Sequence, residues 1–146
     1  MANSKAPRLI DGNKLADKLL GDLALHIANR ELSPKLHIFT SRKNEVSKIY
    51  VNKKRTIGES IGISVIIHEF DHLVETDQLI TQVKTISLLN PDDGVMVQLP
   101  LPAQLSVGSV LKSIPSTQDV DVLNRTIEPR YQQPVTNAVK IALDSC

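Results

Sequence analysis

The chain contains 146 residues, of which 41% are hydrophobic, 23% are charged and 3% are aromatic. This composition is typical of one globular domain and excludes a fibrous or low-complexity chain. A chain of this length buries about 70% of its extended surface on folding, so it needs neither disulfides nor a structural metal. Basic and acidic residues number 17 and 16. This near balance excludes recruitment of nucleic acid or an anionic membrane by overall charge.

Targeting signals are not evident in the sequence. No stretch approaches the roughly 18 apolar residues of a membrane span. The first seven residues lack the apolar stretch of a signal peptide. The single cysteine, Cys146, can form no disulfide within the chain and favours a reducing compartment. We therefore expect a cytoplasmic protein whose binding comes from a local site.

Hydrophobic periodicity predicts helices and strands in alternation along the first half of the chain. A helix is expected over residues 13–30, where leucine or isoleucine recurs at every fourth position. A short β-favouring strand, residues 36–40, follows Pro34. The helical period returns from Val46 and is expected to stop at Gly62, where a left-handed cap is usual.

The second half continues the alternation. The predicted elements are a strand over 64–68, a helix around 79–86 that stops before 90–94, a strand over 95–99, a helix over 106–113 stopped by Pro115, and a helix from Val135. Such an order implies right-handed crossovers between parallel strands. We predict an α/β fold, an open three-layer sandwich with a mostly parallel sheet and helices on both faces. Ligands of such sheets bind beyond the carboxyl ends of the strands, here after Thr40, His68 and Leu99.

The second predicted helix carries a tyrosine and a lysine that suit proton transfer. Tyr50 and Lys54 are four residues apart and share one helix face. An amine beside a phenol or a substrate nitrogen can relay a proton. A solvated basic face with a partly buried tyrosine explains the same residues. Helical geometry does not choose Lys54 over Lys53, because both flank the apolar stripe.

Two later segments carry polar side chains of interest. Gln98 ends the third predicted strand and is followed by Pro100 and Pro102, which hold the chain extended. Its amide both donates and accepts, which suits a heterocycle, although an amide that caps a strand end is equally ordinary. Asp119 and Asp121 alternate, so they lie on one side if the segment is extended. Asp121 could then accept paired hydrogen bonds from an amino-heterocycle; the alternative is a plain turn.

Together these segments resemble the N-terminal, folate-binding domain of the bifunctional methylenetetrahydrofolate dehydrogenase/methenyltetrahydrofolate cyclohydrolase family. The resemblance covers nearly the whole chain, in order and in spacing. Its pieces are Leu9-Ile10-Asp11-Gly12, Ser47-x-x-Tyr50-x-x-x-Lys54, Gly62-Ile63, Asp93-Gly94-Val95-Met96-Val97-Gln98-Leu99-Pro100-Leu101-Pro102 and Asp119-Val120-Asp121. The run from Val97 to Pro102 is highly specific, whereas Tyr-x-x-x-Lys alone is weak.

The resemblance implies an enzyme of one-carbon metabolism and purine biosynthesis. Its two activities would be the NAD(P)-dependent oxidation of 5,10-methylenetetrahydrofolate to 5,10-methenyltetrahydrofolate and the hydrolysis of that product to 10-formyltetrahydrofolate. The resemblance assigns Lys54, rather than Lys53, as the base and acid of both steps, with Gln98 tuning it and Tyr50 positioning the folate. Asp121 would hold the amino-pyrimidine edge of the pterin. The implied substrate-binding residues are Tyr50, Lys54, Gln98, Leu99, Pro100 and Asp121, and no metal is implied.

The chain departs from the family pattern in three places. Arg42-Lys43-Asn44-Glu45-Val46-Ser47 replaces the usual Gly-Asp-(Asp/Asn)-Pro-Ala-Ser loop. Val122 stands where many members have glycine, which removes freedom for a left-handed backbone. Pro134-Val135-Thr136-Asn137 looks like a degraded Pro-Cys-Thr-Pro segment. We expect the loop before Tyr50 and the pterin pocket to differ in shape from those of the family.

The domain organisation expected from the resemblance has two parts. Residues 1–134 would form the folate-binding catalytic domain, and residues 135–146 would begin a helix that leads to an NAD(P)-binding Rossmann domain. No Gly-x-Gly-x-x-Gly turn follows a predicted strand here. We therefore expect a domain fragment or a shortened homologue that binds folate and lacks dehydrogenase activity by itself. The complete protein would use NADP or NAD and could form a homodimer, with no nucleic acid or membrane partner.

Other interpretations fit parts of the sequence. Short-chain dehydrogenases also contain Tyr-x-x-x-Lys, but they need a Gly-rich turn upstream, where only Gly12 and Gly21 occur. The segment His68-Glu69-Phe70-Asp71-His72 holds metal-ligating residues, yet it crosses a strand end without a helical or hairpin frame. We interpret His26 and His37 as structural.

A non-catalytic module that binds folate or a polyanion is the main alternative function. Its basis is a local basic patch of Arg42, Lys43, Lys48, Lys53, Lys54 and Arg55. Polyanion binding without pterin selectivity falls steeply with ionic strength, whereas a folate site keeps its preference for the pterin ring.

Overall fold

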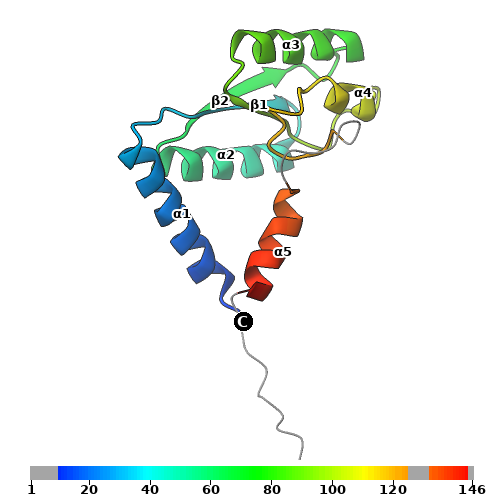
Figure 1. The fold of residues 1–146 in the computed structure, drawn as a ribbon. Helices are drawn as coiled ribbons and strands as arrows, with labels where there is room; N and C mark the ends of the chain where they lie inside the picture. Colours follow the sequence, from blue (N-terminus) through cyan, green and yellow to red (C-terminus); the bar gives the residue numbers. More distant parts are fainter. Residues whose placement is uncertain (1–9, 125–131, 145–146) are drawn as a thin grey trace, which may run out of the picture.

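A parallel three-stranded sheet forms the centre of the computed structural model, which describes residues 10–124 and 132–144 (Figure 1). Its strands are β1 (Lys35–Ser41), β2 (Ser64–Phe70) and β3 (Gly94–Val97), in the order β2-β1-β3. Leu36 of β1 lies opposite Val65 of β2 and Gly94 of β3. The helices are α1 (Gly12–Asn29), α2 (Glu45–Ser60), α3 (Thr76–Leu89), α4 (Val107–Lys112) and α5 (Pro134–Asp144). Leu9 and Cys146 lie outside the described residues.

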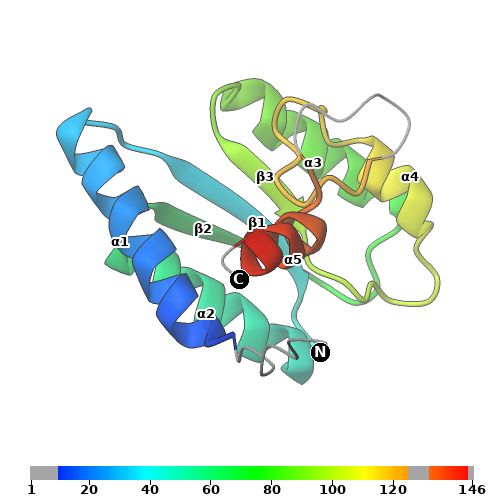
Figure 2. The ribbon, with the colours of Figure 1, turned by 60° about the horizontal axis from the view of Figure 1, so that its bottom comes forward.

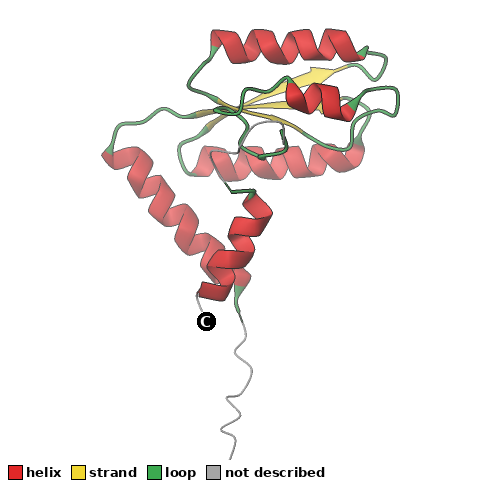
Figure 3. Cartoon of the chain, turned by 45° about the vertical axis from the view of Figure 1, so that its right-hand side comes forward, coloured by secondary structure: helices red, strands yellow, loops and turns green. Residues whose placement is uncertain are grey.

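The two faces of the sheet are covered by different helices (Figure 3). On one face, Ile38, Val65 and Met96 pack with Val51 of α2. On the other face, the strand residues Phe39, Phe70, Val95 and Val97 pack with Leu79 and Val83 of α3 and Val110 of α4. Neighbouring residues of one strand point to opposite faces, so Ile38 and Phe39 enter different cores. The predicted open α/β sandwich with helices on both faces is confirmed.

The third strand is shorter than its predicted range of 95–99. It ends at Val97, although the backbone amide of Gln98 still donates to the carbonyl of Phe39 at 2.8 Å. Pro100 and Pro102 have no N–H to donate, so the ladder cannot continue through them. The chain therefore leaves the sheet at Gln98, at the carboxyl edge where ligands of such sheets bind.

The second helix is held at both ends by the residues that surround it. The side chain of Asn44 accepts a 2.9 Å hydrogen bond from the backbone amide of Ser47, which caps the start of α2. At the other end Gly62 has a φ of +89°, as the sequence predicted. A Cβ there would also lie 3.3 Å from Ile27 of α1. These two ends fix where the polar residues of α2 lie along the sheet.

The helices α1 and α5 extend away from the sheet on the side of α2 (Figures 1 and 2). The side chain of Asp11 caps α1 by accepting from the amides of Asn13 and Lys14, each at 3.1 Å. Although α1 has the predicted apolar face, Ile27 is the residue of α1 that is buried, and no described residue of α5 is buried. None of the described helices combines the length and hydropathy that a bilayer crossing requires.

Candidate functional site

A lysine of α2 and a glutamine beyond β3 meet at the carboxyl edge of the sheet. The ammonium of Lys54 donates to Oε1 of Gln98 at 2.8 Å. The amide of Gln98 is itself oriented, because its Nε2 donates to the carbonyl of Leu99 at 2.8 Å. Its backbone amide is tied to β1 through the carbonyl of Phe39. The partly buried ammonium is thus held by an amide whose own position is fixed by the sheet.

Asp121 lies close enough to Lys54 for the two charges to interact. Burial raises the pKa of the Asp121 carboxyl above its ordinary value, Lys54 lowers it and Asp119 raises it further. An ammonium, an amide and a partly buried carboxyl therefore share one region of the molecule. Such a set can donate a proton, accept one and hold a ligand with paired N–H donors.

The segment that carries Asp121 is a turn, which is the second of the two alternatives that the sequence left open, and not an extended segment. Asp119 forms a single bridge beside Val95, and the residues around it are in turns. The buried carboxylate of Asp119 accepts from the backbone amide of Asn124 at 2.8 Å and so closes the turn. Asp119 and Asp121 consequently differ in surroundings: the first is 4% exposed, and the second is only partly buried.

Val122 takes the left-handed backbone conformation that the sequence marked as difficult for it. Its φ is +54° and its side chain is buried. A β-branched residue in this region is an outlier, because its Cβ crowds the backbone. The turn after Asp121 is therefore kept with a strained valine where the family pattern has glycine.

The other predicted site residues are Tyr50, Leu99 and Pro100. They lie near Lys54, Gln98 and Asp121 but form no hydrogen bond to Lys54 in the structure. Tyr50 is 57% exposed and lies one helical turn before Lys54 on α2. Leu99 is half-buried, and its carbonyl accepts from Gln98. Pro100 is exposed and lines a pocket of about 400 Å³ together with Asn44. The structure thus brings Lys54, Gln98 and Asp121 together and leaves Tyr50 and Pro100 accessible nearby.

Asn44 was not foreseen as a residue of this region. Besides capping α2, its Nδ2 reaches the carbonyl of Pro100 at 3.5 Å, so it joins the altered loop before α2 to the segment after β3. An asparagine three residues before Ser47, at a predicted helix start, is the sequence signal for such a cap.

The basic residues of the proposed polyanion patch have different partners in the structure. Arg42, Lys48 and Arg55 line a pocket beside β2. Lys43 instead lies 2.9 Å from Nε2 of His72, and Lys54 turns toward Gln98. Lys53 is exposed, whereas Lys54 is partly buried. This difference distinguishes the two lysines, which helical geometry alone could not do.

The His68 to His72 segment does not converge on a metal. His68 turns toward His37, at 2.9 Å, whereas Glu69 on the opposite side of β2 lies 3.8 Å from Arg42. Within residues 10–124 and 132–144 no group of three His, Cys, Asp or Glu side chains is placed to hold a metal ion.

Comparisons with known proteins give a consistent picture. The pattern of the tetrahydrofolate dehydrogenase/cyclohydrolase catalytic domain matches residues 10–121. The chain is 37% identical over 113 residues to the bifunctional protein FolD of Mycoplasmoides gallisepticum, covering 77% of the chain and 39% of that protein. It is 33% identical over 117 residues to the bifunctional protein FolD of Rickettsia peacockii, covering 77% of the chain and 41% of that protein. The chain thus spans about two fifths of the length of these relatives.

Solved structures with the same fold include two that the chain matches over almost its whole length. The bifunctional FolD enzyme of Campylobacter jejuni superposes with a TM-score of 0.86 at 24% identity, over 96% of this chain and 54% of that one. The Trypanosoma brucei dehydrogenase-cyclohydrolase, complexed with NADP cofactor and inhibitor, gives a TM-score of 0.82 at 24% identity, over 96% of this chain and 52% of that one. These structures share the fold described above.

Proposed function

Because the chain belongs to the tetrahydrofolate dehydrogenase/cyclohydrolase family, we propose that it binds a reduced folate and carries the proton-transfer side of that chemistry. The reactions are the oxidation of 5,10-methylenetetrahydrofolate and the hydrolysis of 5,10-methenyltetrahydrofolate to 10-formyltetrahydrofolate. The observation that supports this most directly is the 2.8 Å hydrogen bond between Lys54 and Gln98 at the carboxyl edge of the sheet.

Lys54 is proposed as the acid and base. Hydrolysis of a methenyl bridge adds one water to the bridging carbon, opens one carbon–nitrogen bond and releases one proton. As the amine, Lys54 can take a proton from the attacking water, and the resulting ammonium can give that proton to the departing nitrogen, so the second proton of the water is the one released. Gln98 keeps the Nζ of Lys54 in place through its oriented amide.

The other site residues are proposed to bind the substrate. Asp121 accepts hydrogen bonds from the amino-pyrimidine edge of the pterin, and its partly buried position strengthens such bonds. The exposed ring of Tyr50 is free to stack on the folate, while Leu99 and Pro100 form the wall beside it.

In the part of the chain that the structure describes, the turns between strands and helices do not fit a bound dinucleotide. A pyrophosphate needs a glycine-rich turn between a strand and a helix N-terminus. The connections from β1 to α2, from β2 to α3 and from β3 to α4 contain no glycine. We therefore propose that NADP or NAD, which accepts the hydride in the oxidation, is held by a separate nucleotide-binding domain. Residues 1–134 would then be the folate domain and residues 135–146 the start of the connection.

The same proposal extends to the partners, the cellular location and the oligomeric state of the complete protein. A small-molecule folate is its partner, without nucleic acid or membrane, and the complete protein acts in the cytoplasm as a homodimer. These statements extend the family membership and the balanced charge of 17 basic against 16 acidic residues.

The decisive experiment uses the hydrolysis step, which needs no dinucleotide. Binding of 5-formyltetrahydrofolate by calorimetry and the decay of 5,10-methenyltetrahydrofolate absorbance are compared for the wild-type, Lys54→Met and Lys53→Met chains. We expect Lys54→Met to bind folate but to lose the accelerated decay, and Lys53→Met to match the wild type. Equal loss in both variants, or loss only in Lys53→Met, would contradict the assignment.

The same titration separates the alternative of a polyanion-binding module. Repeated at rising salt, binding of 5-formyltetrahydrofolate at a pterin site keeps its preference over a polyglutamate peptide without a pterin ring. Equal, steeply salt-dependent binding of both would favour the module instead.

A further inference from the structure

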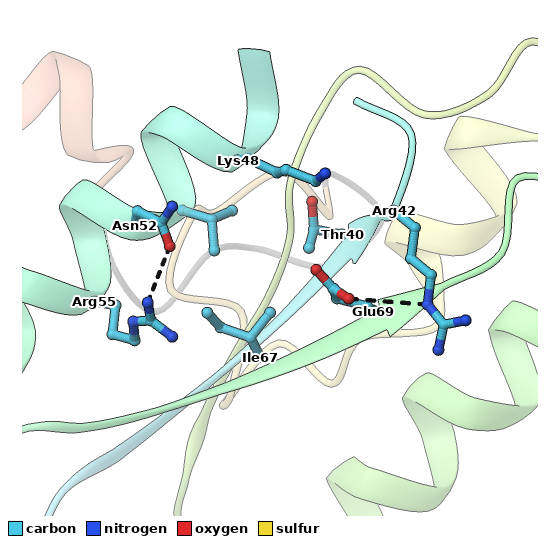
Figure 4. Close-up of a pocket in the computed structure, with 8 residues that line it drawn as sticks. Thr40, Arg42, Lys48, Asn52, Arg55, Ile67 and Glu69 are labelled. Carbon is cyan, nitrogen blue, oxygen red and sulfur yellow. Dashed lines mark hydrogen bonds and ion pairs between the residues drawn. The ribbon is translucent and has the colours of Figure 1, made fainter. Parts of the chain in front are cut away.

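A second pocket lies against the flank of α2 that carries Lys48, Asn52 and Arg55 (Figure 4). It has a volume of about 520 Å³ and opens between α2 and the carboxyl ends of β1 and β2. Its polar lining consists of Thr40, Arg42, Lys48, Asn52, Arg55 and Glu69. Val51 and Ile67 form an apolar wall. This volume lies within the usual range for small-molecule sites.

The pocket is separate from the proposed folate site. Lys48, Asn52 and Arg55 follow one another at spacings of four and three residues, so they share one flank of α2. Tyr50 and Lys54 share the other flank, and the buried stripe of Val51 lies between the two. The folate proposal therefore uses none of the polar groups of the second pocket.

Thr40 gives the pocket a buried polar group that lacks a partner. Its residue is 2% exposed, and its Oγ1 has no hydrogen-bond partner among the described residues. Figure 4 shows its hydroxyl pointing into the pocket on the side of Lys48. Burial of an unpaired hydroxyl is unfavourable, so most such groups in folded proteins have a partner. An acceptor oxygen of a ligand in the pocket would satisfy this one.

The charges around Thr40 favour an anion. Three cations, Arg42, Lys48 and Arg55, line the pocket with the carboxylate of Glu69, and a second carboxylate, Glu45, is paired with Lys48, so the cations remain in excess by one. Glu45 accepts a 2.7 Å hydrogen bond from Lys48, and it raises the pKa of that ammonium, with a smaller contribution from Glu69. Lys48 thus lines the pocket with a carboxylate partner already in place.

The two arginines are only lightly engaged by the protein. Arg42 lies 3.8 Å from Glu69, and Arg55 donates to the neutral Asn52 at 3.1 Å. A guanidinium retains several unused donors after one such contact. Its planar fork matches the paired oxygens of a phosphate group.

We propose that this pocket binds the phosphate group of a small phosphorylated organic molecule. The phosphate accepts from Thr40, Lys48 and the guanidinium of Arg55. The organic part packs on Val51 and Ile67, since the pocket is much larger than one phosphate ion. Glu69 accepts from a hydroxyl of that organic part or keeps Arg42 in place.

The test is a calorimetric titration of the full chain with phenyl phosphate and with inorganic phosphate. We expect saturable binding of both, tighter for phenyl phosphate. Lys48→Gln and Arg55→Gln should each weaken it by about tenfold, the usual effect of losing one charge-assisted hydrogen bond. Lys53→Gln is the matched control, because it removes the same charge from an exposed position of α2 outside the pocket.

Thr40→Val supplies a readout that does not depend on charge. Valine keeps the shape and removes the unpaired hydroxyl, so we expect a higher melting temperature without ligand and several-fold weaker phenyl phosphate binding. Lys54→Met should leave this binding unchanged, which separates the pocket from the folate site. If Thr40→Val does not fold, the two charge variants decide.

Three results would overturn the proposal. No saturable binding of either probe would exclude a phosphate site. Equal weakening by Lys53→Gln, Lys48→Gln and Arg55→Gln would show diffuse attraction to a basic surface. Equal affinity for phenyl phosphate and inorganic phosphate would exclude the organic part of the ligand and leave free phosphate as the occupant.

Discussion

His37 and His68 face each other across β1 and β2, with Nδ1 of His37 2.9 Å from Nε2 of His68. The other nitrogen of His37, Nε2, lies 3.0 Å from Oδ2 of Asp93. One proton arrangement satisfies both contacts when the histidines are neutral: His68 donates to His37, and His37 donates to the carboxylate of Asp93. His37, at 3% exposed, thus has the structural role that the sequence predicted for it.

We expect this pair to make stability fall on the acid side. Burial lowers the pKa of His68, and the neighbouring His37 lowers it further. A histidine whose pKa is lower in the folded state takes up protons on unfolding, so stability is complete above the unfolded pKa and falls as the pH drops below about 6.5. Urea denaturation of wild type between about pH 8 and pH 5 should show this decline.

The His68→Gln chain should be less stable than wild type at pH 8, since His37 loses an ideal donor, but its stability should depend less on pH below neutrality. His26→Gln, on the exposed part of α1, is the control and should keep the wild-type slope. The same slope in both variants would refute the role of His68.

Asp121→Asn should change folate binding and stability in opposite directions. Burial disfavours the charged carboxyl, as its raised pKa shows, so a neutral amide of the same shape should make the free chain slightly more stable at pH 7. Loss of the charge-assisted hydrogen bonds to the pterin should weaken the binding of 5-formyltetrahydrofolate by about 1.5–3 kcal/mol. Calorimetry and urea denaturation measure the two effects, with the exposed Asp92→Asn as control. Unchanged folate affinity would remove Asp121 from the site.

At Val122 we expect the glycine variant to be more stable than the alanine variant, which reverses the usual order. Glycine is normally less favourable than alanine in a folded chain, but at a φ of +54° alanine keeps the backbone strain and glycine does not. We expect Val122→Gly to be more stable than Val122→Ala by about 1 kcal/mol in urea denaturation, although it removes more buried carbon. The usual order, with alanine the more stable, would show that the turn carries no strain in solution.

The chain alone should not bind NADPH specifically. Its six glycines are dispersed along the sequence, and none lies in a described connection from a strand to the following helix, so we expect no backbone cradle for a pyrophosphate. A fluorescence titration with NADPH should show no saturation, and an absorbance assay with 5,10-methylenetetrahydrofolate and NADP should show no NADPH formation. Saturable micromolar binding would reveal a dinucleotide site formed by residues other than a glycine turn.

The sequence predicted the fold well because its helices and strands differ sharply in hydrophobic period. The position of Gly62 and the alternation of strands and helices needed only local rules. Lys54 could not be chosen over Lys53 by such rules, because its partner Gln98 lies 44 residues further along the chain. The sequence could not decide between a turn and an extended segment around Asp121 for a similar reason: the turn is closed by a buried contact between Asp119 and Asn124.

The phosphate pocket depends still more on tertiary structure. Thr40 and Glu69 come together only through the parallel register of β1 and β2, which no local pattern in either strand specifies. Asn52 and Arg55 then face them from α2. A threonine in a predicted strand gives no sign that its hydroxyl will be left without a partner.

The placement of α2 has a consequence for both sites. Lys54 lies on one flank of this helix and Lys48 on the other. On β1, the carbonyl of Phe39 holds Gln98 beside Lys54, and the next residue, Thr40, lines the pocket beside Lys48. If ligands at the two sites are coupled through this shared helix, thermodynamic reciprocity requires each ligand to change the affinity of the other by the same factor.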